Sequence, residues 1–422
     1  MINRPEYIQQ LMAFKDKKIG KILSGVRRSG KSTIFALYQE DLRKNGVRDH
    51  QIQTINLEDV DNEHLLNYKT LYEHVKKHLV LGEMNYVFLD EVQKVKDFQK
   101  TARSLLDKDN VDLYMTGSNS KMLSGEWATS LAGRYVEIHV LPLSFKEYVS
   151  YINSGDAKQF LPDLYNQYTE FGSFPQAVVD FMGASNNKPD GTKIIQFLQG
   201  IYSTIVLKDV SDRQKEKGIS INLNVLENIM KFMSGNIGNI TSPNNIANTM
   251  TSNGTAISTP TIDSYLKAFC DSYIIYKVGR YDVKGKKALQ TLDKYYLVDM
   301  GLRYMLIGNK KDADGYILEN IVYLELLRRG YNISVGKITK RAGGENKTIE
   351  VDFVAQKPGG VIEYYQVAWS VLGNEETLKR EYAPLEEIND NYPKFLLTMD
   401  LGNGGQNGIK RLNVLNWLMG AA

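Results

Sequence analysis

The sequence is poor in residues that build disulfides and zinc sites. It has 1 cysteine, Cys270, among 422 residues, which excludes a disulfide framework and a paired-cysteine zinc site. Its 5 histidines form no HExxH motif. His74 and His78 would share a helix face, but the glutamate of a zinc-protease motif is missing, so we expect a solvated helix face there.

Long hydrophobic runs and a charge imbalance are also missing. No run of 18 apolar residues exists, so no transmembrane helix and no membrane partner are expected. The first residues, MINRPEYIQQ, lack the apolar core of a secretory signal, which makes the cytoplasm the expected compartment. A net charge of +3, from 52 basic and 49 acidic residues, is too near balance to indicate nucleic acid binding by itself.

The composition is that of an ordinary globular protein, with 42% hydrophobic and 24% charged residues. In the first part of the chain, short apolar runs alternate with helical patterns. Strands are expected near 18–24, 53–57, 86–89, 111–115 and 136–141. This alternation predicts an α/β fold, a parallel sheet with helices on both faces.

The rest of the chain changes character twice. Residues 144–235 show no strand pattern and are expected to be helical. Over 222–299, three short helical segments precede two strand-like runs, which is typical of a winged helix. The last part predicts a smaller α/β unit. We therefore expect three parts, 1–150, 151–300 and 301–422.

A phosphate-binding motif follows the first expected strand. Residues 25–32 read GVRRSGKS and fit GxxxxGK[ST] at every fixed position. The glycines let backbone amides face phosphates, and the helix that begins at Lys31 adds its positive end. Lys31 would reach the β- and γ-phosphates, and the Ser32 hydroxyl would bind Mg²⁺. The expected nucleotide contacts are Gly25, Arg28, Ser29, Gly30, Lys31, Ser32 and Thr33.

Two acidic residues end the third expected strand. Asp90 would lie at the carboxyl end of the sheet and hold the metal ion. Glu91 would orient or deprotonate the attacking water, which favours hydrolysis over kinase-type transfer. Seen alone, an acidic pair after a strand is also compatible with a solvated turn.

Three further residues are weaker candidates for catalysis. Ser118 and Asn119 follow the fourth expected strand, where a polar side chain could contact the γ-phosphate or the water; the alternative is a simple turn. Arg134 precedes the fifth strand and could act as an arginine finger across the interface of a homo-oligomer. The alternative for Arg134 is a surface salt bridge.

These motifs together resemble a known family. GVRRSGKST, YVFLDEVQ, TGSNSKMLSG and LAGRY are similar to the AAA-type ATP-binding proteins whose C-terminal half is the domain of unknown function DUF4143. The resemblance continues through FGSFPQAV, IVLKDV, TIDSYLKAF, GRYDVKGKK, KYYLVDMGLR and LENIVYLELLRRGY. It implies an ASCE-type P-loop domain that binds ATP and Mg²⁺, a winged helix, and a terminal unit similar to the PD-(D/E)xK nuclease fold.

The terminal unit departs from the nuclease pattern. Glu319 would be the helix acid, Asp352 the strand acid, and Gln366 the residue at the E/Q position. Ala368 stands where the pattern has lysine, and alanine cannot supply that charge. We therefore expect a nuclease-like unit that has lost cleavage, unless Lys340 or Arg341 supplies the charge.

A basic stretch lies in the expected wing of the winged helix. Its Arg280, Lys284, Lys286 and Lys287 could contact DNA phosphates. The expected recognition helix, TIDSYLKAFCDS, offers only Lys267 as a cation, which weakens base reading. The alternatives are a solvated hairpin and a protein-docking module.

Three functions remain open on sequence grounds. The favoured one is Mg-dependent ATP hydrolysis that drives a conformational switch or motor, with possible action on DNA. The second is an ATP-dependent DNA-processing enzyme with a second metal site at Glu319, Asp352 and Gln366. The third is an ATP-gated protein-binding module without significant turnover.

Overall fold

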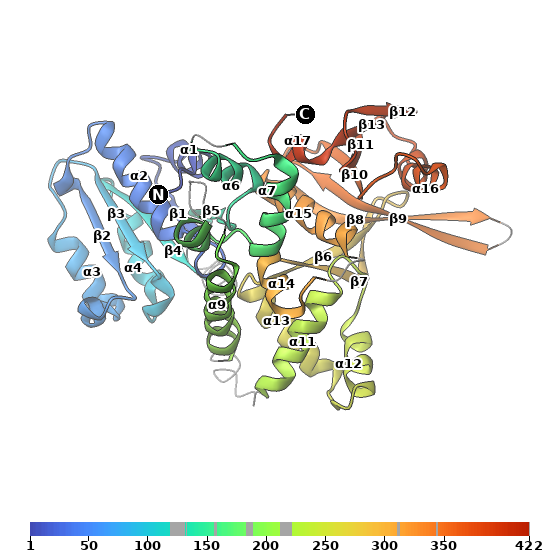
Figure 1. Cartoon of the computed structure of the whole chain (residues 1–422). Coiled ribbons are helices and arrows are strands. Elements are labelled where there is room, and N and C mark those ends of the chain that lie inside the picture. The colour runs from blue at the N-terminus through green and yellow to red at the C-terminus, as the bar shows by residue number, and fades with distance from the viewer. Residues whose placement is uncertain are drawn as a thin grey trace. The chain divides into compact units, whose positions relative to one another are not determined.

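The computed structural model describes residues 1–118, 131, 133–155, 158–182, 189–211, 222–309, 313–342 and 345–421. The chain divides into two compact units (Figure 1). The first contains Met1–Pro142, Phe174–Val179 and Asp271–Tyr273, and the second contains Leu143–Ser173, Asp180–Cys270 and Ile274–Ala422. In the described part of the chain, no helix combines the length and apolarity needed to cross a bilayer.

The first unit is built on a parallel sheet. Its strands are β1 (Gly20–Ser24), β2 (Ile52–Asn56), β3 (Asn85–Asp90), β4 (Val111–Gly117) and β5 (Tyr135–His139). They run in the order β2-β3-β4-β1-β5, and every pairing is parallel. β1, β3 and β4 are buried along their whole length, which explains why each reads as a mainly apolar run without alternation.

Helices cover both faces of this sheet. They are α1 (Pro5–Ala13), α2 (Lys31–Lys44), α3 (Tyr68–Lys77) and α4 (Phe98–Leu106), with short helices η1 (Asp49–Gln51), η2 (Val60–Leu65) and η3 (Val92–Lys94), and α8 (Pro175–Ala177). One core cluster joins α1 and α2 to the sheet, and a separate cluster joins α3 and α4 to it. The expected parallel sheet with helices on both faces is confirmed.

The second unit begins with helices. They are α6 (Phe145–Ile152), α7 (Leu161–Phe171), η5 (Val178–Met182), α9 (Gly191–Tyr202), η6 (Ser203–Val210), α11 (Leu223–Gly235), α12 (Pro243–Ser252), α13 (Thr259–Asp271) and α14 (Met300–Ile307). The expected order of three helices and an antiparallel strand pair over 222–299 is present as α11, α12, α13, β6 (Ile275–Asp282) and β7 (Lys287–Leu297). An isolated bridge between Thr241 and Asp293 adds a third extended segment to this pair.

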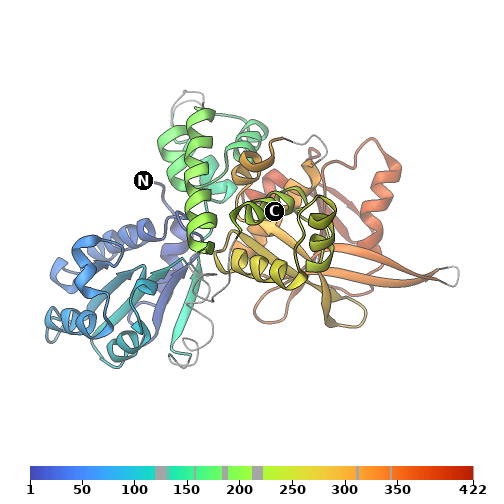
Figure 2. The same cartoon turned by 90° about the horizontal axis from the view of Figure 1, so that it is seen from below.

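The remaining strands join the same sheet. They are β8 (Asn332–Ala342), β9 (Glu345–Gln356), β10 (Ile362–Ala368), β11 (Lys394–Thr398), β12 (Gly404–Gln406) and β13 (Ile409–Asn413). The order of the eight strands is β12-β13-β11-β10-β9-β8-β6-β7. The antiparallel arms of β8 and β9 extend well beyond the other strands (Figures 1 and 2). The helices of this part are α15 (Asp314–Arg328), α16 (Glu375–Glu386) and α17 (Val414–Leu418).

This sheet bears on the expected division of the chain. β6 pairs with β8 in parallel, from Arg280 opposite Val335 to Asp282 opposite Lys337. The expected boundary between residues 300 and 301 therefore separates strands of one continuous sheet. The three-part division stays a prediction, whereas the structure groups the chain into two units.

Candidate nucleotide-binding site

The loop between β1 and α2 has a backbone that only particular residues can adopt. Gly25 has a φ of 139°, and a Cβ there would lie 2.1 Å from the carbonyl oxygen of Val140. Gly30, the N-cap of α2, has a φ of 94°. Both positions lie in the left-handed region that favours glycine. The two fixed glycines of the motif are thus explained by the turn itself.

Lys31 is the first residue of α2, and its side chain folds back over the loop. Its Nζ donates hydrogen bonds to the carbonyl oxygens of Gly25 and Val26, at 3.0 Å each. The first turn of α2 contains no acidic residue. The positive end of the helix and the ammonium group therefore act at the same place, which suits an anion.

A cavity of about 330 Å³ opens at this loop. Its walls include Lys31, Ser32 and Thr33 from the start of α2, and Asp90 and Glu91 from the end of β3. The remaining lining residues are Arg27, Arg28, Gly30, Asn56, Glu58, Pro175 and Gln176. Ser29 is fully buried, and its Oγ has no hydrogen-bond partner in the described part of the chain.

Asp90 is tied to the neighbouring strand. Asp90 ends β3, and the phosphate loop follows β1. Since β4 lies between these two strands, β3 and β1 are not neighbours in the sheet. The hydroxyl of Thr116 on β4 donates to Oδ1 of Asp90, and the same Oγ1 accepts from the backbone N–H of Glu91 at 2.9 Å. Thr116 therefore sets the position of both acidic residues.

Glu91 lies in a left-handed turn, with a φ of 56°. Its Oε2 accepts from the side-chain amide of Gln93 and from the Ser118 hydroxyl, the latter at 3.3 Å. Ser118 is thus placed against the Glu91 carboxylate. Asn119 lies outside the described residues.

Arg134 lies at the other end of the sheet. Its carbonyl oxygen accepts from the N–H of Gly20 at the start of β1, whereas the phosphate loop follows the end of that strand. The guanidinium group donates to Asp107 at 2.7 Å and to the Leu106 carbonyl at 2.8 Å. Arg134 therefore forms a salt bridge within its own chain and does not reach its own cavity.

Several residues at the site were not predicted. Arg4 is buried, and its NH1 and NH2 donate at 2.9 Å to the carbonyl oxygens of Ser29 and Leu141, which braces the phosphate loop. Arg28 donates to the Gln176 side chain at 3.1 Å. No local motif identifies Arg4 or Gln176, because both reach the loop from distant positions in the sequence.

Arg27 and Glu58 form an ion pair at the cavity wall, with 2.9 Å between Arg27 NH1 and Glu58 Oε1. Burial raises the pKa of Glu58, but the hydrogen bond and charge of Arg27 outweigh burial, so the pKa lies below its ordinary value. The pair was also missed by sequence reasoning.

The expected nuclease residues lie in the second unit around a lysine that was not predicted. Lys294 Nζ lies 2.8 Å from Glu319 Oε1, 2.8 Å from Glu350 Oε1 and 3.8 Å from Asp352 Oδ1. The Tyr296 hydroxyl also donates to Glu319 Oε1, at 2.6 Å. A lysine on β7 therefore contacts the two expected acidic residues, Glu319 and Asp352.

The other residues of the nuclease prediction form no hydrogen bond or ion pair with Lys294 in the described part of the chain. Gln366 directs its amide to Glu381 on α16, at 3.2 Å, rather than to the lysine. Lys340 pairs with Glu387, so it does not supply the missing charge, and the Arg341 side chain lies outside the described residues. Among the described residues, no group of three or more acidic, histidine or cysteine side chains has a geometry suited to a metal ion.

The charges of Lys294 and its neighbouring carboxyl groups shift one another's pKa values. Burial lowers the pKa of Lys294, but the carboxylates of Glu319, Asp352 and Glu350 outweigh burial and raise it. Burial, followed by the Glu319 charge, raises the pKa of Asp352. The ammonium group occupies the centre of the carboxylates, where the nuclease pattern would place a metal ion.

The four expected DNA-contacting residues differ in exposure, since three lysines are exposed and Arg280 is buried. Arg280 is 8% exposed, which leaves little of its side chain for the expected contact with DNA phosphates. Lys284, Lys286 and Lys287 are exposed at or beside the turn between β6 and β7. Lys284 Nζ lies 4.0 Å from Glu387 Oε2. Among these four residues, the exposed charges are therefore Lys284, Lys286 and Lys287 near the turn.

Comparison with known protein families identifies an AAA domain in the first unit. Residues 17–149 match the family described as an AAA domain. Residues 162–313 match a domain of unknown function, DUF8612. The expected DUF4143 is not shown, because DUF8612 is the domain that matches after the AAA domain.

Comparisons with whole proteins cover nearly the full length. An uncharacterized protein of Haemophilus influenzae is 36% identical over 421 residues, 99% of this chain and 99% of its own. An uncharacterized protein of Methanocaldococcus jannaschii is 32% identical over 378 residues, 87% of this chain and 78% of its own.

A solved structure shares the fold. The Walker-type ATPase of Pyrococcus abyssi aligns with a TM-score of 0.50 and 14% identity over 72% of this chain and 96% of that one. At this identity the likeness concerns the fold alone. The chain thus belongs to the same protein family as the Haemophilus influenzae protein, and its first unit is an AAA-type P-loop domain.

Proposed function

We propose that the protein binds ATP with Mg²⁺ at the loop 25–32 and hydrolyses it. The supporting observation is that Lys31, the N-terminus of α2 and the two acidic residues Asp90 and Glu91 line one cavity. The amides and side chains of Gly25, Arg28, Ser29, Gly30, Lys31, Ser32 and Thr33 would bind the phosphates. The buried Ser29 hydroxyl, which lacks a partner among the described residues, is compatible with this role.

The cavity wall has suitable ligands for a magnesium ion. Ser32 and Asp90 would hold the ion, because hydroxyl and carboxylate oxygens are the ligands that Mg²⁺ prefers. The ion would neutralise charge that develops on the phosphates during transfer. Thr116 would keep the Asp90 carboxylate oriented, since its hydroxyl donates to Oδ1.

Glu91 is the proposed general base. Both of its described side-chain hydrogen bonds go to Oε2, from Gln93 and Ser118. Within the described residues this arrangement leaves Oε1 to accept the proton of an attacking water. Ser118 and Gln93 then act as positioning residues, and Asn119 is kept as a candidate contact to the γ-phosphate.

Arg134 is proposed to act only in a second copy of the chain. Because it lies at the amino end of the sheet, it would have to enter the cavity of a neighbouring protomer in a homo-oligomer. Gel filtration with and without nucleotide tests this idea. Assembly that depends on nucleotide and turnover that falls in Arg134→Ala support it, whereas a monomer in both states contradicts it.

Two substitutions test the main proposal. In Lys31→Ala, ATP binding measured by calorimetry should be lost, with Lys44→Ala at the exposed end of the same helix as the matched control. In Glu91→Gln, binding should persist while phosphate release falls about 10²–10⁴-fold, with the exposed Glu40→Gln as control. Unchanged turnover in Glu91→Gln would contradict the assigned base, and unchanged binding in Lys31→Ala would contradict the site.

Turnover would drive a conformational switch or motor that includes the second unit. DNA is a candidate partner of this switch. The turn lysines Lys284, Lys286 and Lys287 of the proposed winged helix support phosphate contacts only. An ATPase assay with and without duplex DNA distinguishes the alternatives. Stimulation that disappears in Lys286→Ala/Lys287→Ala supports DNA, whereas no stimulation favours an ATP-gated protein-binding module.

A further inference from the structure

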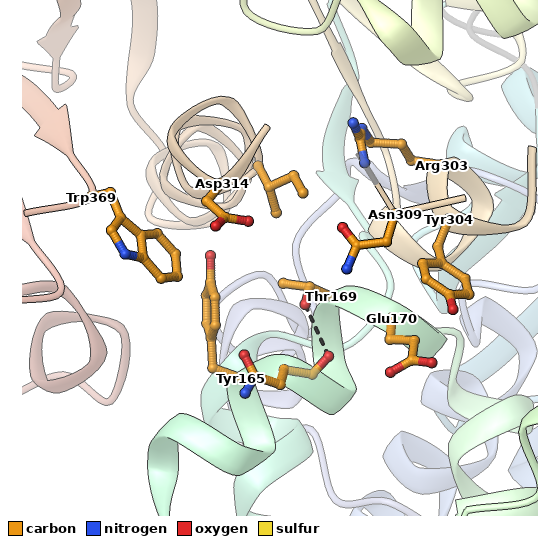
Figure 3. Close-up of a pocket in the computed structure, with 10 residues that line it drawn as sticks. Tyr165, Thr169, Glu170, Arg303, Tyr304, Asn309, Asp314 and Trp369 are labelled. Carbon is orange, nitrogen blue, oxygen red and sulfur yellow. Dashed lines mark hydrogen bonds between the residues drawn. The ribbon is translucent and has the colours of Figure 1, made fainter. Parts of the chain in front are cut away.

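The second unit contains a cavity that no comparison assigns and that is separate from the phosphate loop. It has a volume of about 220 Å³ and is lined by α7, α14, the first turn of α15 and Trp369 (Figure 3). This is smaller than the roughly 300–1,000 Å³ of sites that bury drug-sized ligands. The volume suits a molecule of amino-acid size.

The helices around this cavity are held together without a ligand. Asp299, the N-cap of α14, accepts from the backbone N–H of Ser173 at 2.6 Å and from its hydroxyl at 2.8 Å. A Cβ on Gly301 would lie 2.6 Å from the backbone of Phe171 and Gly172, so α14 packs tightly on the end of α7. The cavity between these helices is therefore preformed.

Arg303 is the cation of the cavity. It is 3% exposed and forms no hydrogen bond or ion pair with any described residue, and its Nε is fully buried. Burial lowers its pKa, and the charge of Asp314 opposes this shift. A buried guanidinium group without a partner is costly, so its position in a cavity wall indicates an anionic group on a ligand.

The opposite side of the cavity carries oxygen atoms that can accept hydrogen bonds. Asp314, at the start of α15, is exposed and forms no ion pair within the described residues. The Tyr165 hydroxyl points toward this carboxylate (Figure 3), is buried, and has no hydrogen-bond partner in the described chain. A cationic N–H group of a ligand would satisfy both.

Aromatic rings form the remaining wall. The rings of Tyr165 and Trp369 have centroids 6.3 Å apart, and Trp369 is 40% exposed. Figure 3 places Trp369, Tyr165 and Asp314 on one side of the cavity and Arg303 and Asn309 on the other. An apolar group of a ligand would contact the rings while its charged groups are bound separately.

We propose that this cavity binds a free α-amino acid with an apolar or aromatic side chain. The carboxylate binds Arg303 and Asn309, the ammonium group binds Asp314, and the side chain packs against Tyr165 and Trp369. A phosphate dianion fits less well, because Asp314 and Glu170 also line the cavity. A dication is disfavoured by Arg303.

The test uses the full chain with L-phenylalanine and L-leucine as probes, in calorimetry and thermal unfolding. Two analogues of phenylalanine serve as comparisons: phenylacetate lacks the ammonium group, and phenylethylamine lacks the carboxylate. We expect one of the amino acids to bind and to raise the unfolding temperature, and both single-charge analogues to bind at least about 10-fold more weakly, as the loss of one charged hydrogen bond implies. Absence of heat and of a thermal shift with both amino acids at millimolar concentration would overturn the proposal.

Two variants keep the test decisive. Asp314→Asn removes an exposed carboxylate, so the protein should stay folded while amino-acid affinity falls about 10-fold or more. Arg303→Met should remove binding even if it changes stability. Glu375→Gln, an exposed carboxylate on α16, is the matched control. Equal affinity in Asp314→Asn, or binding of phenylacetate as tight as that of the amino acid that binds, would show that the ammonium group is not recognised and refute the site.

Discussion

Two buried lysines, one in each unit, have opposite surroundings. Lys31 is 4% exposed and bonds the carbonyl oxygens of Gly25 and Val26, whereas Lys294 is 3% exposed and contacts the carboxylates of Glu319, Glu350 and Asp352. Carbonyl groups carry no net charge, so a phosphate can replace them as acceptors. The carboxylates neutralise Lys294 within the fold.

The comparison shows that burial of a charge does not by itself indicate function. A buried ammonium group needs acceptors, and the identity of those acceptors decides whether a ligand can compete. At the loop, the helix N-terminus also favours an incoming anion. At the acidic cluster, a metal ion would have to displace a lysine that is already bound.

The largest expected effect on stability is at Lys294. Replacing it in Lys294→Met leaves the buried carboxyl groups of Glu319 and Asp352 without their cation and should lower the free energy of unfolding by about 3–5 kcal/mol. Urea denaturation measures the loss, and Lys286→Met on the exposed turn serves as control. If stability is unchanged, the carboxylates do not depend on Lys294 and the comparison fails.

At Lys31 the same substitution should act on binding instead of folding. Lys31→Met removes a charged donor to the phosphates, and ATP affinity should fall about 10²-fold or more, corresponding to roughly 2.7 kcal/mol. Calorimetry gives the affinity and urea denaturation gives the stability. A loss of stability as large as that of Lys294→Met would mean that Lys31 is a structural residue and would remove the contrast.

Gly25 separates backbone effects from charge effects at the loop. In Gly25→Ala, the new Cβ would meet the Val140 carbonyl at 2.1 Å and the residue would keep a positive φ. We expect about 1–3 kcal/mol of destabilisation, with weaker ATP binding because the loop must move. Gly200→Ala is the control, since a Cβ there has open space within the helix α9. Equal stability of the two variants would contradict the close approach.

The smallest effect concerns the pH dependence at the Arg27–Glu58 pair. Because the pKa of Glu58 is lowered by folding, its contribution to stability is present above the ordinary glutamate pKa and is lost as the pH falls through the folded value. The pair is partly exposed, so the contribution should stay below about 1 kcal/mol. Thermal unfolding of the protein and of Glu58→Gln between acidic and neutral pH checks this. Identical pH profiles would show that the pair contributes nothing.

Much of the first unit was predictable because its signals are local. The apolar runs that became β1, β3 and β4, and the loop that precedes Lys31, are contiguous in the chain. The roles of Asp90 and Glu91 stay predictions, although both acids line the expected cavity. Gln93 and Arg4 were not recognised, and Thr116 was noted only as part of the polar run that ends the fourth strand, since a single side chain has no motif that reveals which group it will bond.

The second unit was harder to predict. The expected helices and strand pair over 222–299 exist, but their place in an eight-stranded sheet depends on the pairing of β6 with β8. The sequence alone marked Ala368 as a missing lysine, whereas Lys294 lies on β7, far from that position in the chain. Similarly, Arg280 was expected among the residues that could contact DNA phosphates, but its side chain is buried, because burial follows from the sheet and not from the charge pattern.

The chain by itself determined a parallel α/β unit and a phosphate-loop motif, because strand periodicity, glycine positions and a lysine at a helix start are local properties. Only the tertiary structure decided that Thr116 aligns both acids, that Lys294 contacts three carboxyl groups, and that Arg303 lies unpaired among the described residues. Those relations depend on side chains brought together from distant segments, where distance and burial determine the strength of each charge.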